Sequence, residues 1–225
     1  MTLSDRDAAF KHRYRLFDGT PVPSVTAISG LLDIDGKSAK MAGAAARITR
    51  EGGQYRKEWD AKRDRGTRLH GHLEAFLRGE TIEVREDDAG YVDALEKWVV
   101  ARNPRHAIVE AIVLSEAGYG GRLDVLDGDV LYDLKSGRVN TIDVTLQLAA
   151  YRYADGIAMY DEAGALEWLD APPLLRIKRT VGLYVRENGT YEEIDTVSDH
   201  EAFCAFKQLL DVYRWAKALS RRLLR

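Results

Sequence analysis

The dipeptide Asn103-Pro104 divides the chain into two parts with different apolar periodicity, and this change limits the possible folds more than any other feature. Before it, apolar residues recur at the spacing of a helix, and Ser24 is a plausible N-cap for a short one. The three longer helices predicted there are 38–50, 55–77 and 87–101. We therefore expect a single domain over 1–225, mainly helical over 1–103 and built on a sheet over 104–225.

The part after Asn103-Pro104 is rich in β-branched residues and changes between strand and helix patterns. Asp127-Gly128-Asp129 and Glu187-Asn188-Gly189 are turn signals that predict two hairpins. The predicted strands are 107–114, 119–126, 130–134, 177–185 and 191–194, and the predicted helices are 143–159 and 199–224. This order predicts an α/β or α+β domain, with a mixed central sheet flanked by helices and an N-terminal helical elaboration.

Cysteine and hydropathy exclude several classes of protein. The chain has one cysteine, Cys204, so it cannot form an internal disulfide, a zinc site of several cysteines or a cysteine-ligated iron–sulfur cluster. Its apolar surroundings predict a small buried residue. The chain contains no uncharged apolar run of about 18 residues, so we expect no membrane span. The first residues do not resemble a signal peptide. We expect a cytoplasmic protein.

The net charge of −3 hides an uneven distribution. Residues 37–78 carry 11 Lys/Arg and 5 Asp/Glu, whereas residues 80–135 carry 6 and 13. Residues 205–225 carry 6 and 1. A nuclease would use such a pattern, since carboxylates hold metal ions and surrounding cations hold phosphates. The alternative is that these are ordinary charged helix surfaces.

The segment Asp133-Leu134-Lys135-Ser136-Gly137 ends a predicted buried strand. Because side chains alternate along a strand, Asp133 and Lys135 lie on the same face. Asp124 lies on the preceding strand, across a tight hairpin. Two buried carboxylates repel each other unless a cation separates them, and oxygen ligands favour Mg²⁺ or Mn²⁺. A surface pair at Asp133 and Lys135, with Asp124 in a turn, is the alternative.

Several further motifs, in their order along the chain, resemble the PD-(D/E)XK nuclease superfamily, and within it the RecB-like exonucleases, which include CRISPR-associated and phage-encoded enzymes. The matching segments are Val22-Pro23-Ser24-Val25-Thr26, Gly66-x-x-x-His70-x-x-x-Glu74, Glu110, Gly121-x-x-Asp124, Asp133-x-Lys135-Ser136-Gly137 and Gln147-Leu148-Ala149-Ala150-Tyr151. They cover residues 22–151. The resemblance implies a restriction-endonuclease-like core.

The resemblance also implies a role for each matching residue. His70, Asp124 and Asp133 resemble the metal ligands, together with the backbone carbonyl of Leu134, and Lys135 resembles the catalytic lysine. Gln147 and Tyr151 would support the site and contact the scissile phosphate. Glu110 is an additional acid near the site, and Glu74 would contact the metal-binding histidine. For both His70 and the pair of Gln147 and Tyr151, ordinary packing is the alternative.

Two departures from the family pattern bear on the expected cofactors. The proline that begins the family motif is replaced, since Leu123 precedes Asp124, and the cysteine cluster of the iron–sulfur members is missing. The chain also contains no Walker A motif. We expect Mg²⁺ or Mn²⁺, no iron–sulfur cluster and no use of ATP.

The expected activity is hydrolysis of DNA by a metal-activated water, which leaves 5′-phosphate ends. It would serve DNA recombination, DNA repair or phage DNA processing in a bacterial or phage-infected cytoplasm, and by analogy a single-strand annealing recombinase is a possible partner. Arg63, Arg65 and Arg68 would line a DNA path to His70, and Trp59 would stack on a base or pack in the core. The alternatives are a structure-specific endonuclease of this fold, a non-catalytic nucleic-acid-binding member, and an unrelated α/β protein.

Overall fold

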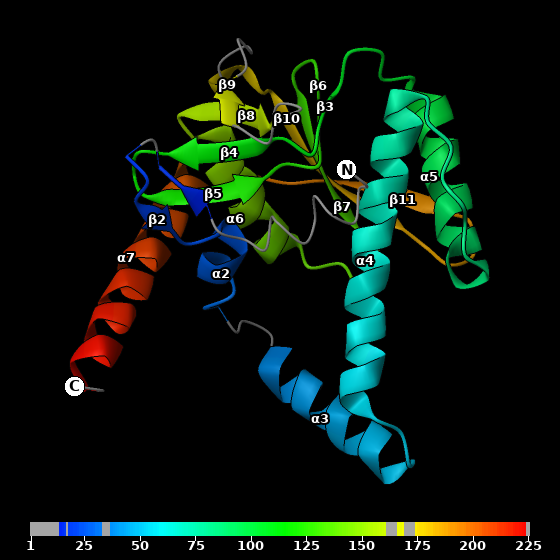
Figure 1. Ribbon diagram of the computed structural model, residues 1–225, viewed down its shortest axis with the longest axis horizontal. Helices are drawn as coiled ribbons and strands as arrows, with labels where there is room; N and C mark the ends of the chain where they lie inside the picture. Colours follow the sequence, from blue (N-terminus) through cyan, green and yellow to red (C-terminus); the bar gives the residue numbers. More distant parts are fainter. Residues whose placement is uncertain (1–13, 17, 33–36, 161–165, 169–173, 224–225) are drawn as a thin grey trace.

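The computed structural model is a mixed α/β fold in which a five-stranded mixed sheet is flanked by helices (Figure 1). It describes residues 14–16, 18–32, 37–160, 166–168 and 174–223. Up to the first sheet strand the elements are β1 (Tyr14–Arg15), β2 (Pro21–Val22), α2 (Val25–Ser29), α3 (Lys37–Arg50), α4 (Tyr55–Arg78), a 3-10 turn (Glu86–Asp88) and α5 (Ala89–Arg102). The remaining elements are β3 (Ile108–Val109), β4 (Ile112–Ser115), β5 (Tyr119–Arg122), β6 (Val125–Asp127), β7 (Val130–Lys135), α6 (Thr141–Arg152), β8 (Gly156–Tyr160), β9 (Leu166–Trp168), a 3-10 turn (Leu174–Arg176), β10 (Arg179–Val185), β11 (Tyr191–Asp195) and α7 (His200–Leu223).

The strands form two main sheets. The first has the order β11-β10-β7-β6-β3, and the second has the order β5-β4-β8-β9. In the first sheet β7 and β10 are parallel, with Asp133 opposite Gly182, and the other neighbours are antiparallel. The mixed central sheet expected from the sequence is therefore confirmed.

One long hairpin passes from the second sheet into the first. Its inner half pairs β4 with β5, and its outer half pairs β3 with β6. The predicted strands 107–114 and 119–126 are each broken, at Glu110 and at Leu123-Asp124. The break arises because Glu110 has a φ of 53°, which lies outside the extended region that regular strand residues adopt. Hydrogen bonds from Leu123 N to Ala111 O (2.9 Å) and from Glu110 N to Asp124 O (3.0 Å) keep the two chains together at this bend.

Two apolar cores lie on opposite faces of the first sheet. Leu69 of α4 and Trp98 of α5 pack with Tyr132 and Leu134 of β7 in one core. The other core joins Leu131 of β7 to residues of α2, α6 and α7. Since Asp133 and Lys135 alternate with Tyr132 and Leu134, they belong to the face that α6 covers.

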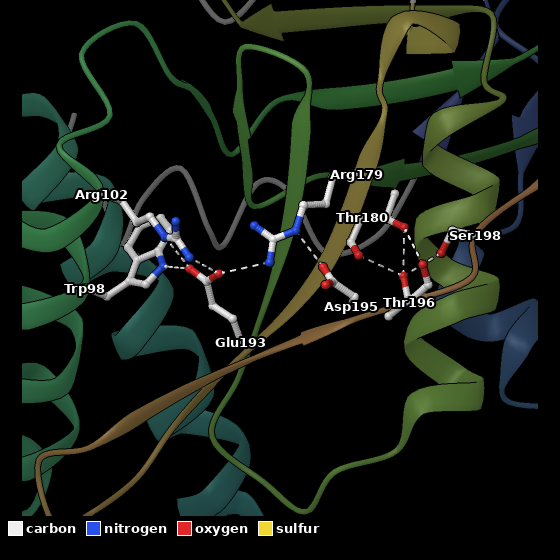
Figure 2. A network of polar contacts seen from close by, with 8 residues as sticks. All are labelled: Trp98, Arg102, Arg179, Thr180, Glu193, Asp195, Thr196 and Ser198. Carbon is white, nitrogen blue, oxygen red and sulfur yellow. Dashed lines mark hydrogen bonds and ion pairs between the residues drawn. The ribbon is translucent and has the colours of Figure 1, made fainter.

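The hairpin β10–β11 is attached to α5 by a network around Glu193, which is shown in Figure 2. Glu193 accepts hydrogen bonds from Trp98 Nε1 (2.8 Å) and Arg102 Nε (2.6 Å), and it pairs with Arg179 Nη2 at 3.3 Å. Arg179 also pairs with Asp195. This network holds the outer edge of the first sheet on the α5 side.

The helix predicted over 143–159 is wrong in its second half. α6 ends at Arg152, and Gly156–Tyr160 instead forms β8, antiparallel to β4. Asp155 directs this change, since its backbone N–H donates to Leu114 O at 3.0 Å and its carboxylate accepts from Ser115 Oγ at 2.7 Å. Residues 156–160 therefore pair with the free edge of β4, although their apolar residues also fit helical spacing.

Three smaller expectations were tested by the structure. Ser24 caps α2, because its side chain accepts a hydrogen bond from Ala27 N, and Gly120 N donates to Pro23 O just before it. Cys204 is half-buried rather than buried as predicted. Within the described ranges, no helix combines the length and apolar character needed to cross a bilayer.

Candidate metal centre

Glu110 and Asp124 lie side by side where the long hairpin bends. Glu110 N donates a backbone hydrogen bond to Asp124 O at 3.0 Å, which holds the two residues next to each other. Both carboxylates are almost fully buried, with side chains 7% and 6% exposed. A non-glycine residue with positive φ costs energy and often marks a functional position, so the bend that aligns Glu110 with Asp124 is a candidate site.

His70 of α4 completes a close group with these two acids. Its Nδ1 lies 3.0 Å from Glu110 Oε1 and 3.3 Å from Asp124 Oδ1. One possible ligand atom from each of the three residues lies within 4.8 Å of the others. Burial lowers the pKa of His70, but the adjacent carboxylates outweigh burial and raise it to about 10. The two carboxylates thus favour positive charge at the His70 ring, and a divalent cation would find suitable ligands at the same place.

Asp133 and Lys135 form the neighbouring part of the site, on the same face of β7 as the sequence predicts. Lys135 Nζ lies 2.5 Å from Asp133 Oδ2. Burial and, to a smaller extent, Asp124 raise the pKa of Asp133, Lys135 lowers it, and the net result is a pKa of about 6. Burial lowers the pKa of Lys135, but the two carboxylates reverse this and raise it. The lysine therefore balances part of the negative charge that the acids concentrate here.

The main chain of β7 orients Asp124. Leu134 N donates to Asp124 Oδ2 at 2.5 Å, which leaves Oδ1 toward His70. Of the expected ligands, the structure brings His70 and Asp124 together with Glu110, the additional acid, while Asp133 contacts Lys135 and Gln147. The expectation that the Leu134 carbonyl is a metal ligand stays a prediction.

Gln147 and Tyr151 of α6 contact the site through one chain of hydrogen bonds. Gln147 Nε2 donates to Asp133 Oδ1 (2.7 Å) and to Tyr151 Oη (3.0 Å), and Lys135 Nζ donates to Gln147 Oε1 (3.4 Å). The Tyr151 ring lies against Gly121, where an added Cβ would be 2.3 Å from Cε1. Their shared helical face is thus turned toward the acids, and Gly121 provides the space for the ring.

Arg122 belongs to this site, although the sequence analysis did not single it out. Its Nε lies 2.6 Å from Glu110 Oε2, on the side of the carboxylate away from His70. Strand alternation from Asp124 back to Arg122 was an available signal, since residues two apart on a strand share a face. Glu110 is consequently held between an arginine and a histidine.

Glu74 has a strong partner of its own. It pairs with Arg78, one turn along α4, with Oε1 2.5 Å from Arg78 Nη2. The carboxylates that contact Nδ1 of His70 are those of Glu110 and Asp124. The expected contact between Glu74 and His70 therefore stays a prediction.

The three arginines expected along a DNA path do not share one environment. Arg68 forms a two-pronged pair with Asp88, at 2.6 and 3.0 Å, and Arg65 lies 3.5 Å from the same fully buried acid. Two and five residues from His70, both point to the opposite side of the helix. They anchor the start of α5, and the expectation that they line a DNA path to His70 stays a prediction. Arg63 lies seven residues from His70, on its face, with a side chain 70% exposed.

Comparison of the chain with protein-family models finds no match. Comparison with the curated proteins finds none either.

Proposed function

We propose that this chain is a metal-dependent deoxyribonuclease of the PD-(D/E)XK superfamily, with a restriction-endonuclease-like core and the exonuclease activity of the RecB-like group. The observation that carries the proposal is the approach of one histidine nitrogen and two carboxylates beside an Asp–Lys pair at the end of a central strand. Perturbed ionisable groups that concentrate at one place are typical of functional sites. The motifs that resemble this superfamily include the same residues.

The donor set fits Mg²⁺ or Mn²⁺. His70, Glu110 and Asp124 would hold the ion, with Asp133 and the Leu134 carbonyl as further candidates. A bound ion would supply an activated water and positive charge beside a phosphate oxygen. Arg122 keeps one oxygen of Glu110 occupied, so that the other faces His70.

The residues of the chain then have separate tasks. Lys135, whose side chain is one-third exposed at the end of β7, can offer its ammonium group to a phosphate oxygen that gains negative charge. Gln147 holds Asp133 and Lys135 in place, and Tyr151 fixes the amide of Gln147. In the reaction, the oxygen of water would bond to phosphorus as the bond to the 3′ oxygen breaks. The attacking water gives up a proton to solvent and the leaving 3′ oxygen takes one up, which leaves a 5′-phosphate and a 3′-hydroxyl.

The proposal is tested with end-labelled linear DNA and a closed circle of the same sequence. Both substrates are incubated with wild type and Lys135→Ala in Mn²⁺, in Mg²⁺ and in chelator. We expect metal-dependent loss of the linear DNA alone, and none with the variant. Nicking of the circle would show that the activity is that of an endonuclease. Absence of cleavage by the wild type under all conditions would reject the enzyme.

DNA is the proposed partner, and recombination, repair or phage DNA processing is the proposed setting. These assignments, and a single-strand annealing recombinase as a second partner, depend on the family resemblance alone.

A further inference from the structure

The face of α4 that carries His70 continues toward the start of that helix for about 21 Å, at 1.5 Å per residue over 14 residues. Residues 4, 7, 11 and 14 positions before His70 share its face within about 40°. They are Gly66, Arg63, Trp59 and Arg56. Figure 1 shows that this first half of α4 extends beyond the sheet, with α3 beside it.

Gly66 has no structural reason to be a glycine. It lies inside a 24-residue helix, where glycine is less favourable than alanine. It is not among the glycines with positive φ, and apart from its chain neighbours and the backbone of its own helix no described atom lies within 4 Å of where its Cβ would be. Its effect is to leave the backbone accessible one turn from His70, which suits a bound molecule that must come close to the helix.

Arg63 and Arg56 supply positive charge on the same face. Arg63 pairs with Asp60 (2.9 Å) and Asp64 (3.3 Å), but these side chains are 70%, 56% and 58% exposed. Exposed ion pairs of this kind are weak, so a phosphate can replace them. Arg56 is also exposed, and its Nε donates to Tyr55 Oη at 3.3 Å.

Trp59 lies between these two arginines. It is half-buried and meets Tyr55 edge-on, with ring centroids 5.5 Å apart at 82°. Arginines interleaved with an aromatic residue are typical of surfaces that bind single-stranded nucleic acid, because only an unpaired base offers its face for stacking.

We infer that this face of α4, formed by Gly66, Arg63, Trp59 and Arg56, binds a single-stranded segment of the DNA substrate next to the metal centre. The backbone of the strand passes over Gly66, phosphates pair with the two arginines, and one base stacks on Trp59. The inference rests on the proposed function and adds the strandedness and the position of the substrate.

The test measures binding of a short labelled single strand and of the matching duplex by fluorescence anisotropy, in chelator so that no DNA is cut. Gly66→Leu should weaken single-strand binding about tenfold by blocking the backbone, and Trp59→Ala should weaken it by a similar factor through lost stacking. Gly43→Leu is the matched control, because Gly43 is also inside a helix, α3, with nothing within 4 Å of its Cβ position. Leucine favours a helix more than glycine does at either position, so thermal melting should show that each variant folds.

A further variant tests the charges. Arg63→Gln should reduce the slope of log affinity against log salt concentration by about 0.7, the value for one phosphate contact on a single strand. Single-strand affinity equal to wild type in both Gly66→Leu and Trp59→Ala would overturn the inference, and so would equal losses for duplex and single strand. If metal-dependent cleavage persists in the wild type, the proposed function survives that outcome. A wild type that neither binds nor cuts DNA would reject both.

Discussion

Two polar networks in this protein, one around Glu193 and one at the candidate metal centre, each shift the pKa of one buried acid, and the two shifts are opposite. The side chain of Glu193 is 8% exposed, and that of Asp133 is 1% exposed. Burial raises the pKa of Glu193, but hydrogen bonds from Arg102 and Trp98 reverse this and lower it. At Asp133 burial prevails, and the pKa is raised to about 6.

The difference follows from the depth of burial and from the other acid nearby. Glu193 has two arginines and an indole around one carboxylate (Figure 2). Asp133 is buried more deeply, and Asp124 beside it raises its pKa further. An acid whose donors lower its pKa stabilises the fold, whereas an acid whose pKa is raised by burial, such as Asp133, destabilises the fold when charged and is typical of a functional position.

The largest expected effect separates activity from stability at the metal centre. Asp133→Asn removes the carboxylate beside Lys135 and should reduce metal-dependent DNA cleavage by about 10³-fold or more. The same change should leave the free energy of unfolding in urea equal to wild type or higher, because the fold raises the pKa of Asp133 and so disfavours its charge. The control is Asp195→Asn, which alters an exposed acid of the other network. Strong destabilisation by Asp133→Asn would show that the acid is structural.

The second prediction concerns Glu193. Glu193→Gln leaves Arg102 without its charged partner and Arg179 with Asp195 alone, and breaking a buried ion pair is strongly destabilising. Since both arginines are about 40% exposed, water replaces part of the loss, and we expect a reduction of about 2 kcal/mol in the free energy of unfolding. Urea denaturation measures it. Cleavage at 25 °C should remain near wild type, and a loss of cleavage in the folded variant would mean that the networks are coupled.

Two glycines sharpen the same comparison. Gly90 of α5 packs against the turn between β10 and β11, and an added Cβ would be 1.7 Å from the Glu187 carbonyl oxygen. Because backbone cannot move away as a side chain can, Gly90→Ala should destabilise by about 3 kcal/mol, the upper part of the range for overpacking. Gly121→Ala meets the Tyr151 ring instead, so we expect about 1–2 kcal/mol. In cleavage assays on folded protein, only Gly121→Ala should lose activity, because it displaces the tyrosine that orients Gln147.

How much of this could be read from the sequence depends on whether the signal was local. The shared face of Asp133 and Lys135 follows from strand alternation, and the structure confirms it. The positions of Arg65 and Arg68 follow from the helical period, since residues two and five before His70 cannot share its face.

The bend at Glu110 is different. Nothing in Val109-Glu110-Ala111 signals a positive φ, because the conformation is imposed by hydrogen bonds to a strand twelve or more residues away. The strand β8 depends in the same way on the free edge of β4. Tertiary contacts of this kind override local propensity, so the third member of the metal group could be named as an extra acid but not placed.

The smallest expected effect is the pH dependence of stability, and it has opposite signs in the two networks. The pKa of Asp133 is about 6 in the folded chain and 3.8 ordinarily, so the folded state takes up the proton first. Lowering the pH from 7 to 5 should therefore stabilise the fold by about 1 kcal/mol. The pKa of Glu193 is lowered from 4.5, so its contribution is present above that value and lost as the pH falls through the folded pKa. Urea denaturation in chelator at pH 7, 6 and 5 measures the first effect as the difference between wild type and Asp133→Asn. That difference should shrink as the pH falls, since the protonated aspartate and the asparagine are both neutral. A difference that is constant from pH 7 to 5 would mean that Asp133 is fully compensated, as Glu193 is, and the contrast between the two networks would be lost.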